Sequence, residues 1–333
     1  MVNWERFDGK PEDWACLLAR TQEANPFQAW AWGEHKRAEG WQAEPWVARE
    51  SGRTLACVQV LKKSLPLGGF LAYAPGGPIL GLPETDGKAK EVLGSWPGAM
   101  RREGILYLRW RSHAPFSEER ERAAGLFRRP SCRINSPHTI EIDLSKPVEV
   151  LRSEMSSKHR YYVRQAEKAA IDWEHGNSAA LVRRMRLLYE EMGRSKGIER
   201  RLFDPGTIPS LAQAFGQDCL ILSGSREGMA LASCLVLKAG PSAFYLMAAT
   251  GPEGRKLSAS YAMIPRLFEI LKAWGVTRLD FGGIDPSSPG AAGVNHFKRG
   301  FGGREILYLG EWEWSPWKPI AWGANALMRL KGL

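Results

Sequence analysis

Short apolar segments of strand length alternate with longer amphipathic segments along the whole chain. Apolar runs such as 55–61 and 234–237 are far shorter than the roughly 18 residues that a membrane-spanning helix needs. Thr139–Leu144 alternates apolar and polar side chains as a half-buried strand does, whereas Ser258–Trp274 has the length and spacing of a helix. The alternation predicts a mixed α/β fold that buries a core.

The length of 333 residues exceeds one ordinary domain and suffices for two. After the strand Thr139–Leu144, Ser145 supplies an N-cap and Pro147 suits the first turn of a helix. We therefore place a domain boundary at 145/146, followed by two helices within 148–170 and another over 179–196. Both halves run from helices to strands to a glycine turn, which favours a duplicated domain.

Positive charge is in excess, because lysine plus arginine outnumber aspartate plus glutamate by 46 − 36 = 10. Such a field attracts phosphate-rich partners, although a generic basic protein would show the same balance. Arg160, Arg164 and Lys168 fall four residues apart on one predicted helix face, beside Lys158 and His159. The stripe either contacts phosphates or is an ordinary solvated helix face.

Five widely spaced cysteines form no CxxC pair, which favours reduced, mostly buried thiols over a disulfide framework or a zinc site. The N-terminus lacks a signal-peptide pattern, so a cytoplasmic protein is expected. Many of the 14 tryptophans cluster near the two ends, where they would share a core if both ends belong to one domain. The aromatic, apolar and basic segment 312–331 suits either a membrane surface or docking on the first domain, and we favour docking.

Five segments, in order along the chain, together resemble the FemABX family of peptidyltransferases. They are Phe27–Trp41 with its Q-x-x-x-W-x-x-x-K-like pattern, the turn Tyr73–Pro78, Thr139–Leu144 with Lys158–Ala166, the helix segment Tyr189–Gly197, and Leu279–Ile284 with Gly293–Gly303. The last is the most specific, since it resembles the family's D-F-G-G … G-x-x-x-F-K-x-x-F-G block. Gly76 departs from the family, where arginine is common.

The resemblance implies two tandem GNAT-like acyltransferase domains, over 1–145 and 146–304, with 305–333 returning to complete the first. No long charged heptad segment is present, so a compact protein without a coiled-coil arm is expected. The implied reaction is aminolysis of an aminoacyl-tRNA ester by an amine, such as that of a cell-wall muropeptide. It needs neither cofactor nor metal, because the ester is already activated, and the protein is expected to be a monomer.

Lys298 is the first candidate for catalysis, together with the preceding Phe297. We expect it in a glycine-flanked loop, where its ammonium polarises the ester carbonyl or holds the terminal phosphate, unless it is merely a surface lysine. Asp280, expected where a strand ends at a glycine turn, is either a base for the attacking amine or a cap of that turn, and we favour the cap. Asp285 is a weaker candidate for the same role.

The acceptor would be held by Lys36 and Arg194, which match family positions that contact acceptor phosphates. Tyr73 and Tyr245 would hydrogen-bond its peptide, unless they only pack. The resemblance also favours tRNA contact by Arg160, Arg164 and Lys168, which would be salt-sensitive and independent of sequence.

An acyl-CoA-dependent N-acyltransferase of the same fold is the alternative. Residues 251–258, Gly-Pro-Glu-Gly-Arg-Lys-Leu-Ser, partly resemble a pyrophosphate-binding loop that precedes a helix. A non-catalytic RNA- or membrane-binding protein is a third interpretation, without any RNA-binding motif in its favour.

Overall fold

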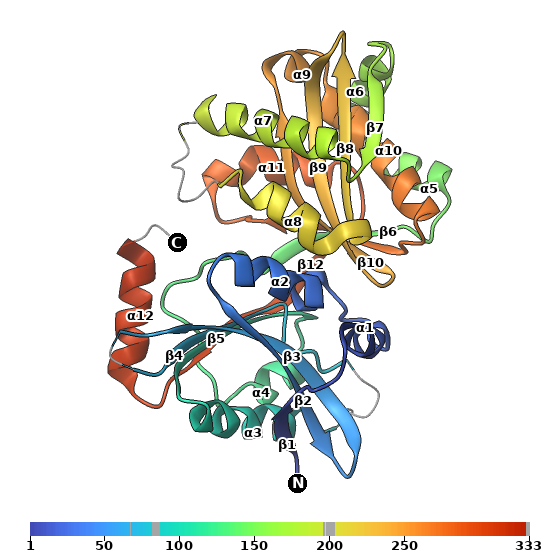
Figure 1. Cartoon of the computed structure of the whole chain (residues 1–333). Coiled ribbons are helices and arrows are strands. Elements are labelled where there is room, and N and C mark those ends of the chain that lie inside the picture. The colour runs from blue at the N-terminus through green and yellow to red at the C-terminus, as the bar shows by residue number, and fades with distance from the viewer. Residues whose placement is uncertain (67, 82–86, 196, 198–203, 331–333) are drawn as a thin grey trace. The chain divides into compact units, whose positions relative to one another are not determined.

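The computed structural model divides into two compact units, residues 1–138 with 306–333 and residues 139–305 (Figure 1). It describes every residue except 67, 82–86, 196, 198–203 and 331–333. Lys196, the expected end of one helix, and the basic Lys331 therefore lie outside the described residues. The division after residue 138 differs from the expected 145/146 because Ile140, Ile142 and Leu144 pack in the core of the second unit.

The first unit is built on a sheet whose strand order is β1-β2-β3-β4-β5-β12. Among the strands that the structure describes in this unit, β4 and β5 pair in parallel, with helix α3 between them in the chain, and the other pairs are antiparallel. The elements are β1 (Asn3–Arg6), α1 (Pro11–Ala19), α2 (Trp30–Ala38), β2 (Gln42–Glu50), β3 (Arg53–Ser64), β4 (Phe70–Pro75), α3 (Ala89–Arg102), β5 (Ile105–Pro115), α4 (Glu118–Ala123), β12 (Arg304–Trp314) and α12 (Lys318–Leu330).

Alternation along β2 and β3 sends side chains to two different cores. Trp46 and Val58 belong to the core that includes α3, whereas Val47 and Cys57 belong to the core that includes α1. Trp4, Trp46 and Trp312 share the α3 core, so tryptophans from both chain ends meet as predicted. Cys57, Cys132, Cys219 and Cys234 are buried free thiols, and Cys16 is exposed.

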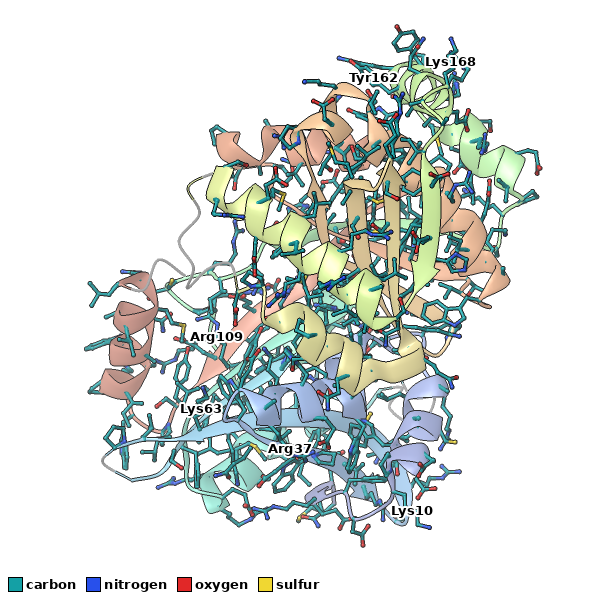
Figure 2. All side chains as sticks on the ribbon, turned by 45° about the horizontal axis from the view of Figure 1, so that its top comes forward. Lys10, Arg37, Lys63, Arg109, Tyr162 and Lys168 are labelled. Carbon is teal, nitrogen blue, oxygen red and sulfur yellow. The ribbon has the colours of Figure 1, made fainter. Side chains whose placement is uncertain are left out.

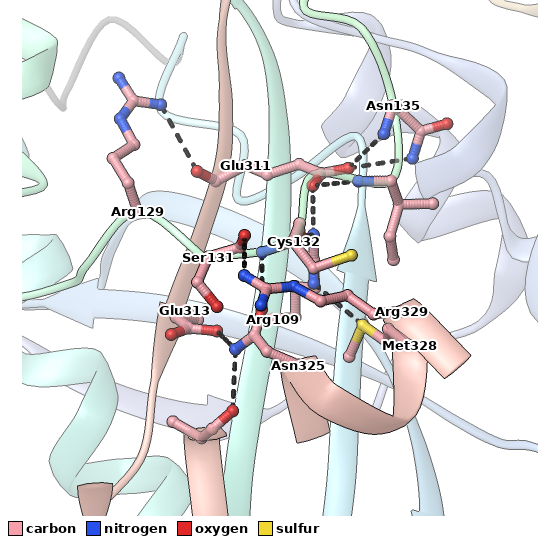
Figure 3. Close-up of polar contacts among 12 residues, drawn as sticks. Arg109, Arg129, Ser131, Cys132, Asn135, Glu311, Glu313, Asn325, Met328 and Arg329 are labelled. Carbon is pink, nitrogen blue, oxygen red and sulfur yellow. Dashed lines mark hydrogen bonds and ion pairs between the residues drawn. The ribbon is translucent and has the colours of Figure 1, made fainter. Parts of the chain in front are cut away.

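A buried polar network fastens α12 and the segment 131–135 to β5 and β12 (Figure 3). Arg109 on β5 pairs with Glu311 on β12, and both side chains are almost fully buried. The Glu311 carboxylate also accepts the N–H groups of Ile134 and Asn135, each at 3.0 Å. Asn325 of α12 donates to Glu313 at 2.6 Å. The carboxylates of β12 thus organise the segment and the helix beside it.

The second unit has a sheet with the strand order β6-β11-β10-β9-β8-β7. Figure 1 shows α7 and α8 on one face and α10 on the other. The elements are β6 (His138–Asp143), α5 (Val148–Glu154), α6 (Ser157–Glu167), β7 (Asp172–Gly176), α7 (Ala179–Ser195), α8 (Thr207–Phe215), β8 (Cys219–Arg226), β9 (Met229–Ala239), β10 (Ser242–Thr250), α9 (Pro252–Lys256), α10 (Ala259–Ala273), β11 (Arg278–Ile284) and α11 (Ala292–Arg299).

The two units share a plan: antiparallel strands end in a helical crossover to a parallel strand. In the first unit α3 leads from β4 to the parallel β5, and in the second α9 and α10 lead from β10 to the parallel β11. The longest helix in the described part of the chain is α7, with 17 residues. No described helix has the length and apolar character to cross a membrane.

At the start of the motif segment Phe27–Trp41, Pro26–Gln28 forms a 3-10 turn and helix α2 begins at Trp30. Gln28 is fully buried, and its side chain donates to the Pro75 carbonyl at 2.7 Å and accepts the Gln59 N–H at 2.7 Å. The glutamine of this segment therefore ties strands together. Gly76 has φ +72°, and a Cβ there would lie 2.2 Å from Asn25 Oδ1, so this chain has no room for a larger residue.

Candidate active site

A cavity of about 520 Å³ opens in the second unit where β10 and β11 stop pairing. The parallel pairing covers Ser242–Phe244 and Arg278–Asp280, and the β10–β9 register shifts between Tyr245 and Met247. The cavity is lined by residues of α7, β10, α9, α10 and α11: Met192, Tyr245, Leu246, Ala248, Ala249, Thr250, Arg255, Ser260, Tyr261, Met263, Gly293, Val294, Phe297 and Lys298. Three of the predicted site residues, Tyr245, Phe297 and Lys298, are among them.

Lys298 lies in the last turn of α11, not in the loop that its flanking glycines suggested. The helix forms because Asn295 is buried beneath it and exchanges hydrogen bonds with the Asp285 backbone, at 3.0 and 2.7 Å. Asp285 is thereby a backbone anchor of the helix that carries Lys298.

The ammonium of Lys298 lies where the strands β10 and β11 separate. Its Nζ donates to the Gly283 carbonyl at 2.8 Å. A Cβ at Gly282, where φ is +81°, would lie 2.9 Å from that Nζ and 3.0 Å from the Tyr245 carbonyl, so glycine makes room for it. Burial lowers the pKa of Lys298 to about 8, while the nearby Asp280 carboxylate opposes that shift. The side chain is a cation at neutral pH that titrates near the physiological range.

Asp280 lies inside β11, which continues through Gly282 and Gly283 to Ile284 rather than ending at the expected glycine turn. Its carboxylate accepts a hydrogen bond from the Thr139 hydroxyl and one from the Gly282 N–H, the latter at 2.8 Å. These contacts are those of a carboxylate that stabilises a backbone turn. These hydrogen bonds hold Gly282 in the conformation that leaves room for the Lys298 ammonium.

Phe297 lies in a cluster of aromatic rings with His159, Tyr261 and Phe301, which sequence reasoning did not predict. His159 is completely buried, and its Nε2 lies 3.0 Å from the Phe297 carbonyl while its Nδ1 lies 2.8 Å from Ser156 Oγ. Burial lowers the pKa of His159, so the expectation that it extends the basic end of α6 is wrong. A Cβ at Gly300 would lie 1.9 Å from the imidazole. His159 therefore positions the end of α11 rather than meeting a ligand.

Ring contacts lead from the cavity to the surface of α6. Tyr261 lies 5.3 Å from Phe297 and 4.7 Å from Tyr162 between ring centroids, and Tyr162 lies 5.7 Å from Tyr161. Tyr161 is half exposed, at 51%. Figure 2 shows Tyr162 and Lys168 together at this outer part of the unit. The sequence offered no signal for Tyr261, because its spacing in the helix is that of a packing residue.

The three cations of α6 do not form one free stripe. Arg160 donates to the carbonyls of Ser153 at 2.9 Å and of Met155, and so caps the preceding helix α5. Arg164 and Lys168 are exposed, and Lys168 is the C-cap of α6. Only these two remain as surface cations of the predicted tRNA contact.

The predicted acceptor residues are divided between the units. In the first unit, Lys36 pairs with Glu39 at 2.7 Å and lies 5.0 Å from the Trp32 ring centroid, while burial raises the pKa of Tyr73 on β4. In the second unit, Arg194 is exposed in the last turn of α7. Burial raises the pKa of Tyr245 well above its usual value, so that phenol stays protonated.

The segment 251–258 is not an open phosphate loop. Residues Pro252–Lys256 form helix α9, in which the Arg255 N–H donates to the Gly251 carbonyl at 3.0 Å. A Cβ at Gly254 would lie 1.9 Å from the Leu231 carbonyl. Close packing of α9 on β9 therefore requires glycine at this position, which accounts for Gly254 without pyrophosphate binding.

Residues 217–329 match the FemAB family. The structure resembles the crystal structure of FemX, with a TM-score of 0.84 and 16% identity over 96% of this chain and 100% of that one. It also resembles a tandem GNAT protein from the clavulanic acid biosynthesis pathway, with a TM-score of 0.56 and 13% identity over 95% and 98% of the two chains. A third likeness is to the C-terminal domain of a putative lysylphosphatidylglycerol synthetase from Agrobacterium fabrum, with a TM-score of 0.59 and 12% identity over 96% of each chain. A search of curated protein sequences found no match. The predicted FemABX resemblance and the predicted tandem GNAT-like α/β fold are confirmed.

Proposed function

We propose that this chain, whose residues 217–329 match the FemAB family, moves an aminoacyl group from a charged tRNA to the amine of a peptidoglycan precursor peptide. The family match and the structural likeness to FemX support the coarser part of this proposal, an aminoacyl-tRNA-dependent aminoacyltransferase. The acceptor and the mechanism are our proposal, as is action in the cytoplasm. The observation that supports the mechanism best is the Lys298 ammonium, half-buried in the wall of the cavity with its Nζ fixed by the Gly283 carbonyl.

The reaction needs an electrostatic catalyst more than a nucleophile. The neutral acceptor amine attacks the ester carbonyl, a tetrahedral oxyanion forms, and the ribose oxygen leaves with the proton that the amine gives up. Lys298 stabilises the oxyanion, because a partly desolvated cation interacts with developing negative charge more strongly than a solvated one. Phe297 and Tyr245 wall the cavity and restrict water there. Asp280 holds the Gly282 turn rather than acting as the base.

The RNA end is proposed to approach over α6. Unpaired bases stack on aromatic rings, and Tyr161, Tyr162 and Tyr261 supply such rings from the exposed helix face to the cavity. Arg164 and Lys168 lie on the same helix and would contact phosphates. Arg160 is committed to the end of α5 and contributes indirectly, by holding α6 in place.

Lys36 and Tyr73 in the first unit, and separately Arg194 in the second, are proposed to contact charged and polar groups of the acceptor. A guanidinium such as that of exposed Arg194 can bind a phosphate through two parallel hydrogen bonds. The acyl-CoA alternative loses its main support, because the residues expected to bind pyrophosphate form α9.

The direct test is transfer of a labelled amino acid from a charged tRNA pool to nucleotide-linked and lipid-linked muropeptides. We expect transfer that RNase abolishes, because the ester of the charged tRNA drives the reaction. A thermal-shift assay with acetyl-CoA tests the acyl-CoA alternative. We expect acetyl-CoA to leave the unfolding temperature unchanged. Transfer from acetyl-CoA together with inactivity toward every charged tRNA would refute the proposal.

A second measurement tests the tRNA surface. Replacing Arg164 and Lys168 by glutamine should reduce the slope of log affinity against log salt concentration by about 1.4 to 1.8, because two phosphate contacts are lost. The matched control is the double change of exposed Arg101 and Arg102 in α3 to glutamine. An unchanged slope in the α6 variant, or an equal change in the control, would remove α6 from the RNA contact.

A further inference from the structure

Helix α12 docks through its small and polar face and leaves its large apolar face open. At roughly 100° per residue, Trp322, Ala326, Leu330 and Leu327 fall within an arc of about 140°. Ala321, Ala324, Asn325 and Met328 occupy the opposite side. A helix of a globular protein ordinarily buries its large apolar side chains, so this orientation requires an explanation.

The docking contacts of α12 are specific. Asn325 is 2% exposed; it accepts the Cys132 N–H at 3.1 Å and donates to Glu313 at 2.6 Å. Met328 Sδ lies 3.0 Å from Arg109 Nη1, and Arg329 donates to the Ser131 carbonyl at 2.6 Å. Figure 3 shows these groups converging on the face of α12 that meets β5 and β12. The helix cannot rotate its apolar face inward without breaking this network.

The open face is unusually apolar for a protein surface. Trp317 is 56% exposed, Trp322 68%, Leu327 52% and Leu330 81%. Four large apolar side chains within 14 consecutive residues exceed the scattered exposure that is normal for surfaces. Two of them are tryptophans, the side chain that partitions most characteristically to the boundary between lipid and water.

The charged residues of 315–330 indicate which kind of partner binds the apolar face of α12. Residues 315–330 contain no aspartate or glutamate, and their charged residues are Lys318 and Arg329. At roughly 100° per residue both cations lie beside Trp322 along one edge of the apolar face; Lys318 is exposed, and Arg329 also donates to the Ser131 carbonyl. An apolar face bordered by cations complements an anionic lipid surface, where each basic residue adds attraction.

We propose that α12 binds the surface of an anionic lipid bilayer, with Trp322, Leu327 and Leu330 inserted at the interface. Its 13 residues extend about 20 Å, less than the roughly 30 Å hydrocarbon core, so the helix lies along the surface. The inference stands on α12 alone and does not rest on the proposed aminoacyl transfer. Docking on the first unit and lipid binding therefore involve opposite faces of one helix.

Flotation of the full-length protein with lipid vesicles tests the proposal. We expect the protein to float with vesicles of phosphatidylcholine and phosphatidylglycerol, and to bind less to phosphatidylcholine alone or in high salt. Leu327→Glu should reduce binding by about tenfold or more, because it introduces a charge into the inserted face. Lys318→Gln should reduce binding by about fivefold, the value of one basic residue near an anionic surface.

The matched control is Leu187→Glu on α7, because Leu187 is 51% exposed and Leu327 is 52% exposed. Circular dichroism should show both variants folded, since both side chains point to solvent. Absence of flotation at lipid excess, or equal loss in the two variants, would overturn the proposal. So would a concentration-dependent dimer that Leu327→Glu makes monomeric, because a second copy of the chain would then cover this face.

Discussion

Replacing Lys298 by methionine should lower the rate of aminoacyl transfer at least about a hundredfold while making the folded protein more stable. Loss of one well-placed oxyanion donor raises the barrier by roughly 3 to 4 kcal/mol. Burial lowers the pKa of Lys298 to about 8 from 10.5, so the folded state disfavours the ammonium that exists at neutral pH. Methionine removes that penalty, and after allowance for partial exposure the gain is about 1 to 2 kcal/mol.

The pH dependence distinguishes this role from a structural one. Below pH 8 the ammonium is present in both folded and unfolded states, and its destabilising effect is complete. Between about 8 and 10.5 only the unfolded state keeps the proton, so the wild type gains stability and its deficit against the methionine variant narrows. The catalytic rate should fall over the same rise in pH, because the cation is lost.

Single-turnover transfer and denaturant unfolding across this pH range are the measurements. Lys298→Arg is the matched control, because it keeps a positive charge above pH 8 and should lose the alkaline decline in rate even if its absolute rate is lower. Normal transfer by the methionine variant, with normal folding, would remove Lys298 from the mechanism. A rate loss accompanied by an equal loss of stability would instead indicate a packing role.

The local motif around Lys298 was enough to select this residue as a candidate, but not to predict that it lies in a helix. Glycines at 293, 300 and 302 suggested a loop, whereas the buried Asn295 amide and its two hydrogen bonds to Asp285 stabilise a helix there. That pairing depends on the ends of β11 and α11 meeting in space. Local propensity carries no information about such a contact, and tertiary structure overrides it.

The same limitation explains His159 and Arg160, which sit within a basic run. The prediction of two helices within 148–170 is confirmed by α5 and α6. It could not show that the chain turns sharply between them, so that Arg160 reaches back to the carbonyls that end α5. It also could not show that Gly300 leaves space for a buried imidazole. Both facts depend on backbone from other elements.

Replacing Glu311 by alanine should cost about 3 to 5 kcal/mol of unfolding free energy, the largest stability loss that we expect from one substitution. The change leaves Arg109 buried without its carboxylate, and an uncompensated buried charge is strongly destabilising. It also removes the acceptor of the Ile134 and Asn135 N–H groups. For a unit of this size the midpoint of thermal unfolding should fall by roughly 6 to 20 °C.

Calorimetry of three variants separates the causes of that loss. Glu118→Ala breaks an ion pair whose side chains are 82% and 71% exposed, and it should cost under about 1 kcal/mol. The double change Arg109→Met with Glu311→Leu removes both charges and should recover much of the stability lost in Glu311→Ala, because the buried charge itself is gone. If the double variant is as unstable as the single one, the carboxylate matters chiefly as an acceptor for 134–135. In that case the hydrogen bonds of the segment, rather than the ion pair, hold it against β12.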